Sequence, residues 1–135
     1  MIANWYGANA AMLQRLFGNV SYDDQCFTWV RIQNFTLPPV YNQYSTALLI
    51  RTPGYNIENH VDYHFYLNKV LQRTDGVNMT HYFDDASYND LSRLGYARLS
   101  YHLRTFRPTM DLVSGDNLVD ICQGVYNFLA QRQGV

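Results

Sequence analysis

The chain has 135 residues, 47% of them hydrophobic and 16% charged, which is the composition of one globular domain with a single core. Its 10 basic and 11 acidic residues give a net charge of −1, so the overall charge favours neither a nucleic acid nor an anionic membrane as a partner. Two cysteines, Cys26 and Cys122, are too few for a disulfide scaffold, and their spacing does not indicate zinc or redox chemistry.

The first part of the chain predicts a short helix and then a strand. Apolar residues recur at helical spacing over residues 9–17, and Gly18 is a typical helix end. From Phe27, aromatic and β-branched residues alternate with period two, which is typical of a strand, until Pro38 and Pro39 end it. The first residues lack the basic and apolar regions of a signal peptide, so we expect a cytoplasmic protein without a membrane segment.

Two further strands are predicted in the middle of the chain. Residues 45–52 form a nearly continuous apolar run that ends at a Pro-Gly turn signal, which indicates a central buried strand. Over residues 63–71 apolar and polar side chains alternate, which predicts a strand with one buried face. The polar stretch that follows, up to about Asp90, is too long for a simple hairpin loop and is therefore a candidate functional segment.

The last element is a helix that Ser114 or Asp116 would cap. Its apolar residues form one stripe, and Gly124 within it indicates close packing. The stripe consists of Leu118, Ile121, Cys122, Val125, Phe128 and Leu129. With Cys26 expected in the first strand and Cys122 on this stripe, we expect both cysteines in the core. The order of elements predicts a single α+β domain over residues 1–135, an antiparallel meander flanked by terminal helices.

Two sequence blocks stand out in the chain. The first is Leu37-Pro38-Pro39-Val40-Tyr41-Asn42, followed by the strand at 45–51 and by Pro53 and Tyr55. The second consists of Ser100, His102, Phe106, Arg107, Pro108 and Asp111. In this order the two blocks resemble the bacterial group of ubiquitin-conjugating (E2-like) proteins called prokaryotic E2 family E. Phe106 stands where most members carry Trp. The resemblance covers roughly residues 27–129 and implies a UBC/RWD-like fold.

The resemblance also implies a cysteine for thioester chemistry just before the second block, and none is present there. The corresponding segment, residues 97–102, has no cysteine, and the usual His-Pro-Asn triplet is missing as well. Neither Cys26 nor Cys122 is expected to be a surface thiolate. We therefore expect a binding or scaffolding subunit in place of a conjugating enzyme, with a ubiquitin-like protein, an E1-like enzyme or a JAB peptidase as its partner.

Three residues keep an enzymatic alternative open. Ser100 and His102 would form a nucleophile–base pair in an extended segment, and Asp111 is the candidate that would orient the histidine. The competing interpretations are a histidine whose ring is satisfied by backbone groups and a histidine that contacts a partner. A third hypothesis, from the same resemblance, is an RWD-like module that forms a homodimer.

Partner contacts are expected from the arginines before the last helix and from the first block. Arg98, Arg104 and Arg107 could bind the carboxylates of a partner's C-terminal tail or acidic patch, or could be solvated surface residues. Tyr41 and Asn42 of the first block are further candidates.

A metal site is not expected. His60, Asp62 and His64 have suitable side chains, but in an extended strand the two histidines would lie about 13 Å apart. The sequence predicts no cofactor either.

Overall fold

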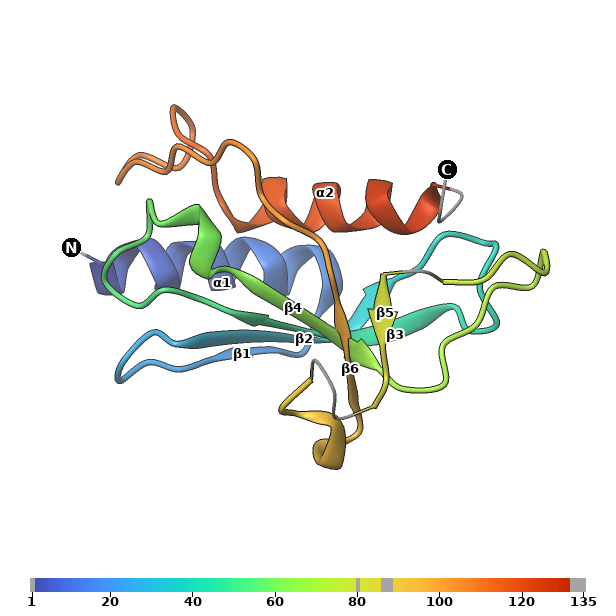
Figure 1. The fold of residues 1–135 in the computed structure, drawn as a ribbon. Helices are drawn as coiled ribbons and strands as arrows, with labels where there is room; N and C mark the ends of the chain where they lie inside the picture. Colours follow the sequence, from blue (N-terminus) through green and yellow to red (C-terminus); the bar gives the residue numbers. More distant parts are fainter. Residues whose placement is uncertain (1, 80, 86–88, 132–135) are drawn as a thin grey trace.

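In a computed structural model, the chain is an α+β protein with an N-terminal helix, a six-stranded antiparallel sheet and a C-terminal helix. The structure describes residues 2–79, 81–85 and 89–131. Both α-helices lie on the same side of the sheet (Figure 1). The elements in chain order are α1 (Ile2–Phe17), β1 (Val20–Tyr22), β2 (Trp29–Thr36), β3 (Ser45–Arg51), the 3-10 helix η1 (His60–Asp62), β4 (His64–Asn68), β5 (Tyr82–Phe83), the 3-10 helix η2 (Ser92–Leu94), β6 (Tyr96–Leu99) and α2 (Leu118–Ala130).

The sheet begins as a meander and ends with a crossed pair of strands. The strand order is β1-β2-β3-β4-β6-β5, and every neighbouring pair is antiparallel. The chain leaves β4, forms the edge strand β5 and returns through η2 as β6, which fills the place between β4 and β5. The stretch up to about Asp90 that the sequence left without structure therefore contributes the edge strand β5, and β6 follows it.

The core lies between the helices and the inner face of the sheet. Alternate residues of β2 and β3 point inward, among them Val30, Ile32, Leu48 and Ile50, all at 0% exposure. The inner residues of β4 and β6, together with the apolar stripe of α2, complete one contiguous core. Because a single core joins both helices to the sheet, the described residues form one packed unit.

Helix α1 begins earlier than predicted, at Ile2 and not near Asn9. Ile2, Trp5, Tyr6, Asn9 and Leu13 follow helical spacing, and the last four are buried against the sheet and α2. Burial of two large aromatic side chains supplies the stabilisation that extends the helix, because each buries a large apolar area. The prediction failed there because Asn4 and Gly7 interrupt the apolar pattern.

Strand β2 also differs from its prediction at the start. Phe27 has φ +58°, in the left-handed region, so the strand begins at Trp29. The Phe27 ring stacks on Tyr6 at 5.0 Å between ring centroids, and its carbonyl accepts the Thr52 hydroxyl at 2.6 Å. Core packing and a buried hydrogen bond therefore hold a bulky residue in a conformation that it rarely adopts.

The prediction of the strand at 45–52 is confirmed within one residue, whereas that at 63–71 is too long. Strand β4 ends at Asn68, and Val70 has φ +61°, which no strand residue adopts. The face of β4 that was predicted to be polar is also less exposed than a polar face would be, because Tyr66 is only 3% exposed.

Asn117 caps helix α2, and not Ser114 or Asp116 as predicted. Its side chain accepts the Val119 and Asp120 backbone N–H groups at 2.9 and 3.1 Å, and the Asp120 carboxylate accepts the Asn117 N–H at 2.9 Å. This reciprocal arrangement is a capping box. The predicted apolar stripe is confirmed, with Phe128 partly exposed and its other members buried.

At the C-terminal end of helix α2, the side chain of Arg73 binds backbone carbonyls. The guanidinium donates to the Leu129 and Gln131 carbonyls at 3.2 and 2.8 Å and pairs with Asp75 at 2.8 Å. The Arg73 side chain is only 3% exposed, whereas that of its partner Asp75 is 35% exposed. Over the described part of the chain, no helix is long and apolar enough to span a membrane.

Candidate functional site

The helices leave one face of the sheet open, and cross-strand register arranges its side chains in two rows. Trp29, Arg51 and His64 are successive partners across β2, β3 and β4. The next row runs from Arg31 through Leu49, Tyr66 and Arg98 to Phe83. Neighbouring side chains in such rows lie close enough to interact directly. Aromatic and cationic side chains from five strands thereby share one surface.

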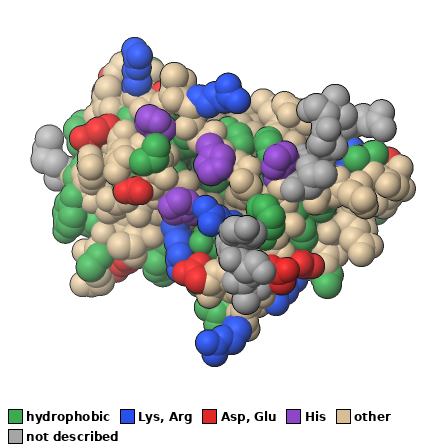
Figure 2. Space-filling model, in the orientation of Figure 1, with side chains coloured by type: hydrophobic (Ala, Val, Ile, Leu, Met, Phe, Trp, Pro, Cys, Tyr) green, Lys and Arg blue, Asp and Glu red, His purple; other side chains and the backbone are tan. Residues whose placement is uncertain are grey.

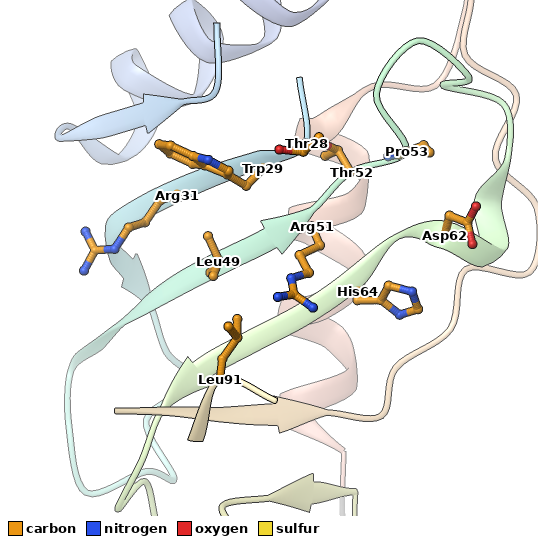
Figure 3. Close-up of a pocket in the computed structure, with 10 residues that line it drawn as sticks. All are labelled: Thr28, Trp29, Arg31, Leu49, Arg51, Thr52, Pro53, Asp62, His64 and Leu91. Carbon is orange, nitrogen blue, oxygen red and sulfur yellow. The ribbon is translucent and has the colours of Figure 1, made fainter. Parts of the chain in front are cut away.

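A groove of about 700 Å³ lies on this face, over β2, β3 and the start of β4 (Figure 3). Trp29 and Leu49 form an apolar base between Arg31 and Arg51, and Leu91 closes the side nearest η2. Pro53 and Asp62 lie at the end where His64 is found. A surface with an apolar base and charged rims suits a partner that presents both kinds of group. We call it the open-face groove.

Arg51 is fixed in the centre of the open-face groove. Its Nη1 atom is 2.8 Å from the Asp90 carboxylate and 3.3 Å from the Tyr66 hydroxyl, and its guanidinium lies 5.3 Å from the centroid of the Tyr66 ring. The bond from Arg51 lowers the pKa of Asp90. Arg31 is held in turn by the Tyr96 hydroxyl, at 2.8 Å from its Nε. Both guanidiniums are thus positioned before any partner binds.

His64 lies where positive charges converge. Burial lowers its pKa most, and the charges of Arg98, Arg51 and His102 lower it further, with only Asp62 acting in the opposite direction. The side chains of Arg98 and His64 come from neighbouring strands, so the sheet itself brings them together. Figure 2 shows histidine side chains gathered on one face of the molecule, beside Lys and Arg. The charges of Arg98 and Arg51 therefore disfavour the protonated form of His64.

Ser100 and His102 do lie together, just after β6. The Ser100 Oγ is 3.3 Å from His102 Nε2, and with the imidazole proton on Nδ1 the hydroxyl donates to Nε2. They line a small pocket of about 250 Å³ with Arg98 and Phe83. We call it the Ser100 pocket. It joins a hydroxyl, an imidazole and a guanidinium at the outer edge of the sheet.

Asp111 is not brought to this pair. Its Oδ1 accepts the Val113 N–H at 3.0 Å, and its carbonyl accepts the Thr109 hydroxyl at 2.6 Å, both within its own loop. Nothing in the described residues gives it a hydrogen bond to His102. The expected triad is therefore reduced to a Ser–His pair, because the loop closes on itself.

Arg104 and Arg107 lie beyond the Ser100 pocket, near the start of α2. Arg104 lines a separate polar cavity of about 410 Å³ that includes His102, Asp116 and Asp120. The backbone of Arg107 is bonded to Asp116, and both arginines are exposed. The acidic residues of this cavity reduce the positive charge available to a partner there.

Tyr41 and Asn42, predicted as partner contacts, serve the fold. Tyr41 is 5% exposed, and its hydroxyl donates to the Leu129 carbonyl at 2.7 Å. Asn42 exchanges hydrogen bonds with Gln72 and donates to the Val70 carbonyl. These side chains fasten loops to one another and to α2, and their role in partner binding stays a prediction.

The two cysteines have different environments, and one differs from its prediction. Cys122 is buried, and burial raises its pKa to about 12. Cys26 is exposed, in a turn before β2 and outside the core. Its backbone N–H donates to the Asp23 carboxylate, and Asp24 is adjacent in the same turn. Reactive thiolates are favoured by neighbouring cations, and this turn presents carboxylates.

The segment considered for a metal is not extended as predicted, because His60 and Asp62 belong to the 3-10 helix η1 and only His64 lies in a strand. Among the described residues, no group of three or more His, Cys, Asp or Glu side chains could hold a metal ion.

The sequence did not identify the central residues of the open-face groove. The period-two pattern placed Trp29 and Arg31 on one face, but Arg51 ended an apolar run without any signal of function. Leu91 reaches the groove from the segment whose structure the sequence did not reveal. Comparisons with protein-family models, with curated proteins and with solved structures find no match for this chain.

Proposed function

We propose that this chain is an E2-like, UBC/RWD-related binding subunit of a bacterial ubiquitin-like pathway in the cytoplasm, and that it binds the ubiquitin-like protein without forming a thioester to it. The two sequence blocks suggest the pathway. The open-face groove is the observation that carries the binding role, because Trp, Tyr and Arg side chains are the residues most enriched where binding energy concentrates.

The geometry of the groove supports binding in preference to catalysis. Arg51 and Arg31 are already held by Asp90 and Tyr96, so a partner would meet a surface that needs little ordering. Trp29 is 36% exposed, which leaves a large part of its ring for contact. Neither cysteine has the electropositive surroundings of a reactive thiolate.

The test is calorimetric titration of this protein with the purified ubiquitin-like protein, E1-like enzyme and JAB peptidase of its pathway. Trp29→Ala should weaken binding of the ubiquitin-like protein by about 10-fold or more, since an aromatic contact at the centre of an interface contributes about 2 kcal/mol. Tyr44→Ala is the matched control, because Tyr44 is 97% exposed and does not line the groove. No binding of the ubiquitin-like protein, or equal effects of the two variants, would refute the proposal.

A second function, acyl transfer through Ser100, is favoured by its contact with His102. In that reaction Ser100 Oγ attacks the thioester carbonyl of an activated ubiquitin-like protein, and His102 takes the hydroxyl proton. An ester bond forms as the C–S bond breaks, and the E1 thiolate leaves with the proton from His102.

Intact-mass spectrometry after incubation with the E1-like enzyme, ATP and the ubiquitin-like protein separates the two functions. An adduct that survives reductant, is lost with hydroxylamine and is absent from Ser100→Ala supports acyl transfer. A reductant-sensitive adduct that disappears in Cys26→Ser would instead identify the exposed thiol as the acceptor. No adduct from an active E1 supports the binding subunit.

A further inference from the structure

The two ends of the open-face groove carry opposite charges. Arg31 lies at one end and Asp62 at the other, beyond His64 (Figure 3). Trp29 and Leu49 form the apolar base near the positive end. This surface has a direction, because only a partner with the reverse order of charges can pair with both ends at once.

At the positive end, the guanidinium of Arg31 is bonded only to neutral groups among the described residues. Its Nε donates to the Tyr96 hydroxyl at 2.8 Å, and its Nη1 donates to the side-chain oxygen of Gln33 at 2.6 Å. These bonds fix the side chain, and no carboxylate in the described part of the chain forms an ion pair with it. Arg31 therefore offers an oriented cation whose remaining N–H groups are available to an acceptor.

At the negative end, Asp62 is exposed in η1, and its carboxylate accepts a hydrogen bond from the neutral Asn59 amide at 2.7 Å. His64 lines the same end of the groove, but burial and the nearby arginines lower its pKa, so it is mainly uncharged near neutral pH. Over the described residues, no cation forms an ion pair with Asp62. The carboxylate is therefore available to a cation from another molecule.

The charges at the centre of the groove are already balanced. Arg51 lies between Arg31 and Asp62, and its guanidinium is 2.8 Å from the Asp90 carboxylate (Figure 3). A two-fold axis parallel to the sheet and passing over Arg51 would set Arg31 of each copy opposite Asp62 of the other. The two Arg51–Asp90 pairs would meet at the axis, where neither brings a net charge. The groove is thus complementary to itself.

We propose that the open-face groove binds a second copy of this chain, in an isologous dimer whose two identical ion pairs join Arg31 of each copy to Asp62 of the other. The same rotation sets the exposed ring of Trp29 opposite Pro53 of the second copy, so an apolar contact forms beside each ion pair. The dimer itself depends neither on the resemblance nor on the proposed function, because both charges and the apolar base belong to one surface. Its regulatory consequence rests on the proposed function, since the dimer would cover the residues that bind the ubiquitin-like protein.

The experiment measures the mass of the protein in solution by sedimentation equilibrium over a concentration series. Arg31→Glu and Asp62→Arg should each weaken the dimer by at least about 10-fold, because each variant sets like charges against each other at both ends of the interface. Arg15→Glu is the matched control, because Arg15 is exposed on α1, which packs on the other side of the sheet.

An equimolar mixture of Arg31→Glu and Asp62→Arg should form the dimer again. In the mixed dimer the introduced carboxylate faces the introduced guanidinium, and the other end keeps its native pair, so both contacts are attractive. A variant that was merely misfolded would not be rescued by its counterpart. Added salt should weaken the parent dimer, because salt screens exposed ion pairs.

A protein that stays monomeric at about 1 mM, where even a dimer with a Kd of about 1 mM would be half formed, would overturn the inference. A dimer that neither charge reversal weakens, or a mixture of the two variants that stays monomeric, would overturn it as well. If the ubiquitin-like protein still binds in a Trp29-dependent way, the proposed function stands without the dimer. If the dimer forms and the ubiquitin-like protein does not bind, the proposed function fails and the dimer stands.

Discussion

Gly124 is the residue with the least room for a substitution in α2. A Cβ atom at this position would overlap the Tyr101 hydroxyl and lie 3.2 Å from Tyr101 Cζ. Tyr101 also packs against Phe65 and Phe128, at 5.3 and 5.2 Å between ring centroids, so its ring has little freedom to move. The absence of a side chain at Gly124 therefore allows the segment after β6, which carries Ser100 and His102, to approach the helix.

We expect Gly124→Ala to destabilise the protein by about 1–3 kcal/mol, because overpacking outweighs the gain in helix propensity of about 1 kcal/mol. Tyr101→Phe removes the overlapping oxygen, so the same glycine substitution should cost less in that background. Urea denaturation of the two single variants and the double variant measures the coupling. An equal cost in both backgrounds would show that the hydroxyl does not restrict this position.

At the scale of elements, Asn9 connects the two helices. Its amide donates to the Trp5 carbonyl and its carbonyl accepts the Leu118 N–H, both at 2.8 Å, and the residue has 0% exposure. Leu118 is the first residue of α2, where backbone N–H groups have no partner within the helix. A buried polar residue on the apolar side of α1 thereby fixes the position at which α2 begins.

Asn9→Ala should cost about 1–3 kcal/mol, because it leaves the Leu118 N–H buried without an acceptor. Gln123→Ala is the control on α2, where an exposed bond to Asn127 is removed and a change within about 0.5 kcal/mol is expected. Thermal unfolding followed by circular dichroism gives both values. A loss at Asn9 no larger than that at Gln123 would contradict the role of Asn9.

The elements also show where sequence patterns carried information. The apolar run of β3 is nearly continuous and the apolar stripe of α2 is periodic, so the hydrophobic pattern alone predicted both elements. Strands β5 and β6 have two and four residues, too few for a period to be recognised. Their place in the sheet depends on a crossed return of the chain, which no local pattern encodes.

The candidate site was predictable only where it is local in sequence. Ser100 and His102 are two residues apart, so their contact could be anticipated from spacing alone. The approach of His64 to Arg98 depends on strand pairing, which the sequence does not reveal. The separation of Asp111 from Ser100 and His102 depends on hydrogen bonds within the loop that contains Asp111. Cys26 was misplaced because Phe27, whose backbone is left-handed, separates the turn that contains Cys26 from strand β2.

At the scale of the whole molecule, two carboxylates link folding to acid pH. The bond from Arg73 lowers the pKa of Asp75 to about 2, and bonds led by that from the Thr28 hydroxyl lower the pKa of Asp23 to about 2. An unfolded aspartate titrates near pH 3.9. As the pH falls, the unfolded chain therefore takes up protons first, so this stabilisation is complete above about pH 4 and is lost towards pH 2.

Asp75→Asn and Asp23→Asn should each make the free energy of unfolding less dependent on pH between about 4 and 2. Urea denaturation at several pH values in this window, compared with neutral pH, gives the slope for each variant and for the parent protein. Slopes identical to that of the parent protein would show that these carboxylates have the same pKa in the folded and unfolded chains.

The two tryptophans lie in different environments, one in the core and one on the open face of the sheet. Trp5 is 1% exposed, and its buried indole N–H has no hydrogen-bond partner among the described residues, whereas Trp29 is 36% exposed on the open face. The two tryptophans can therefore serve as separate fluorescent reporters. Emission from Trp5 in Trp29→Phe reports whether the chain is folded, and iodide quenching of Trp29 in Trp5→Phe reports whether the groove is covered. Unfolding and occupancy can therefore be followed optically without attaching a dye.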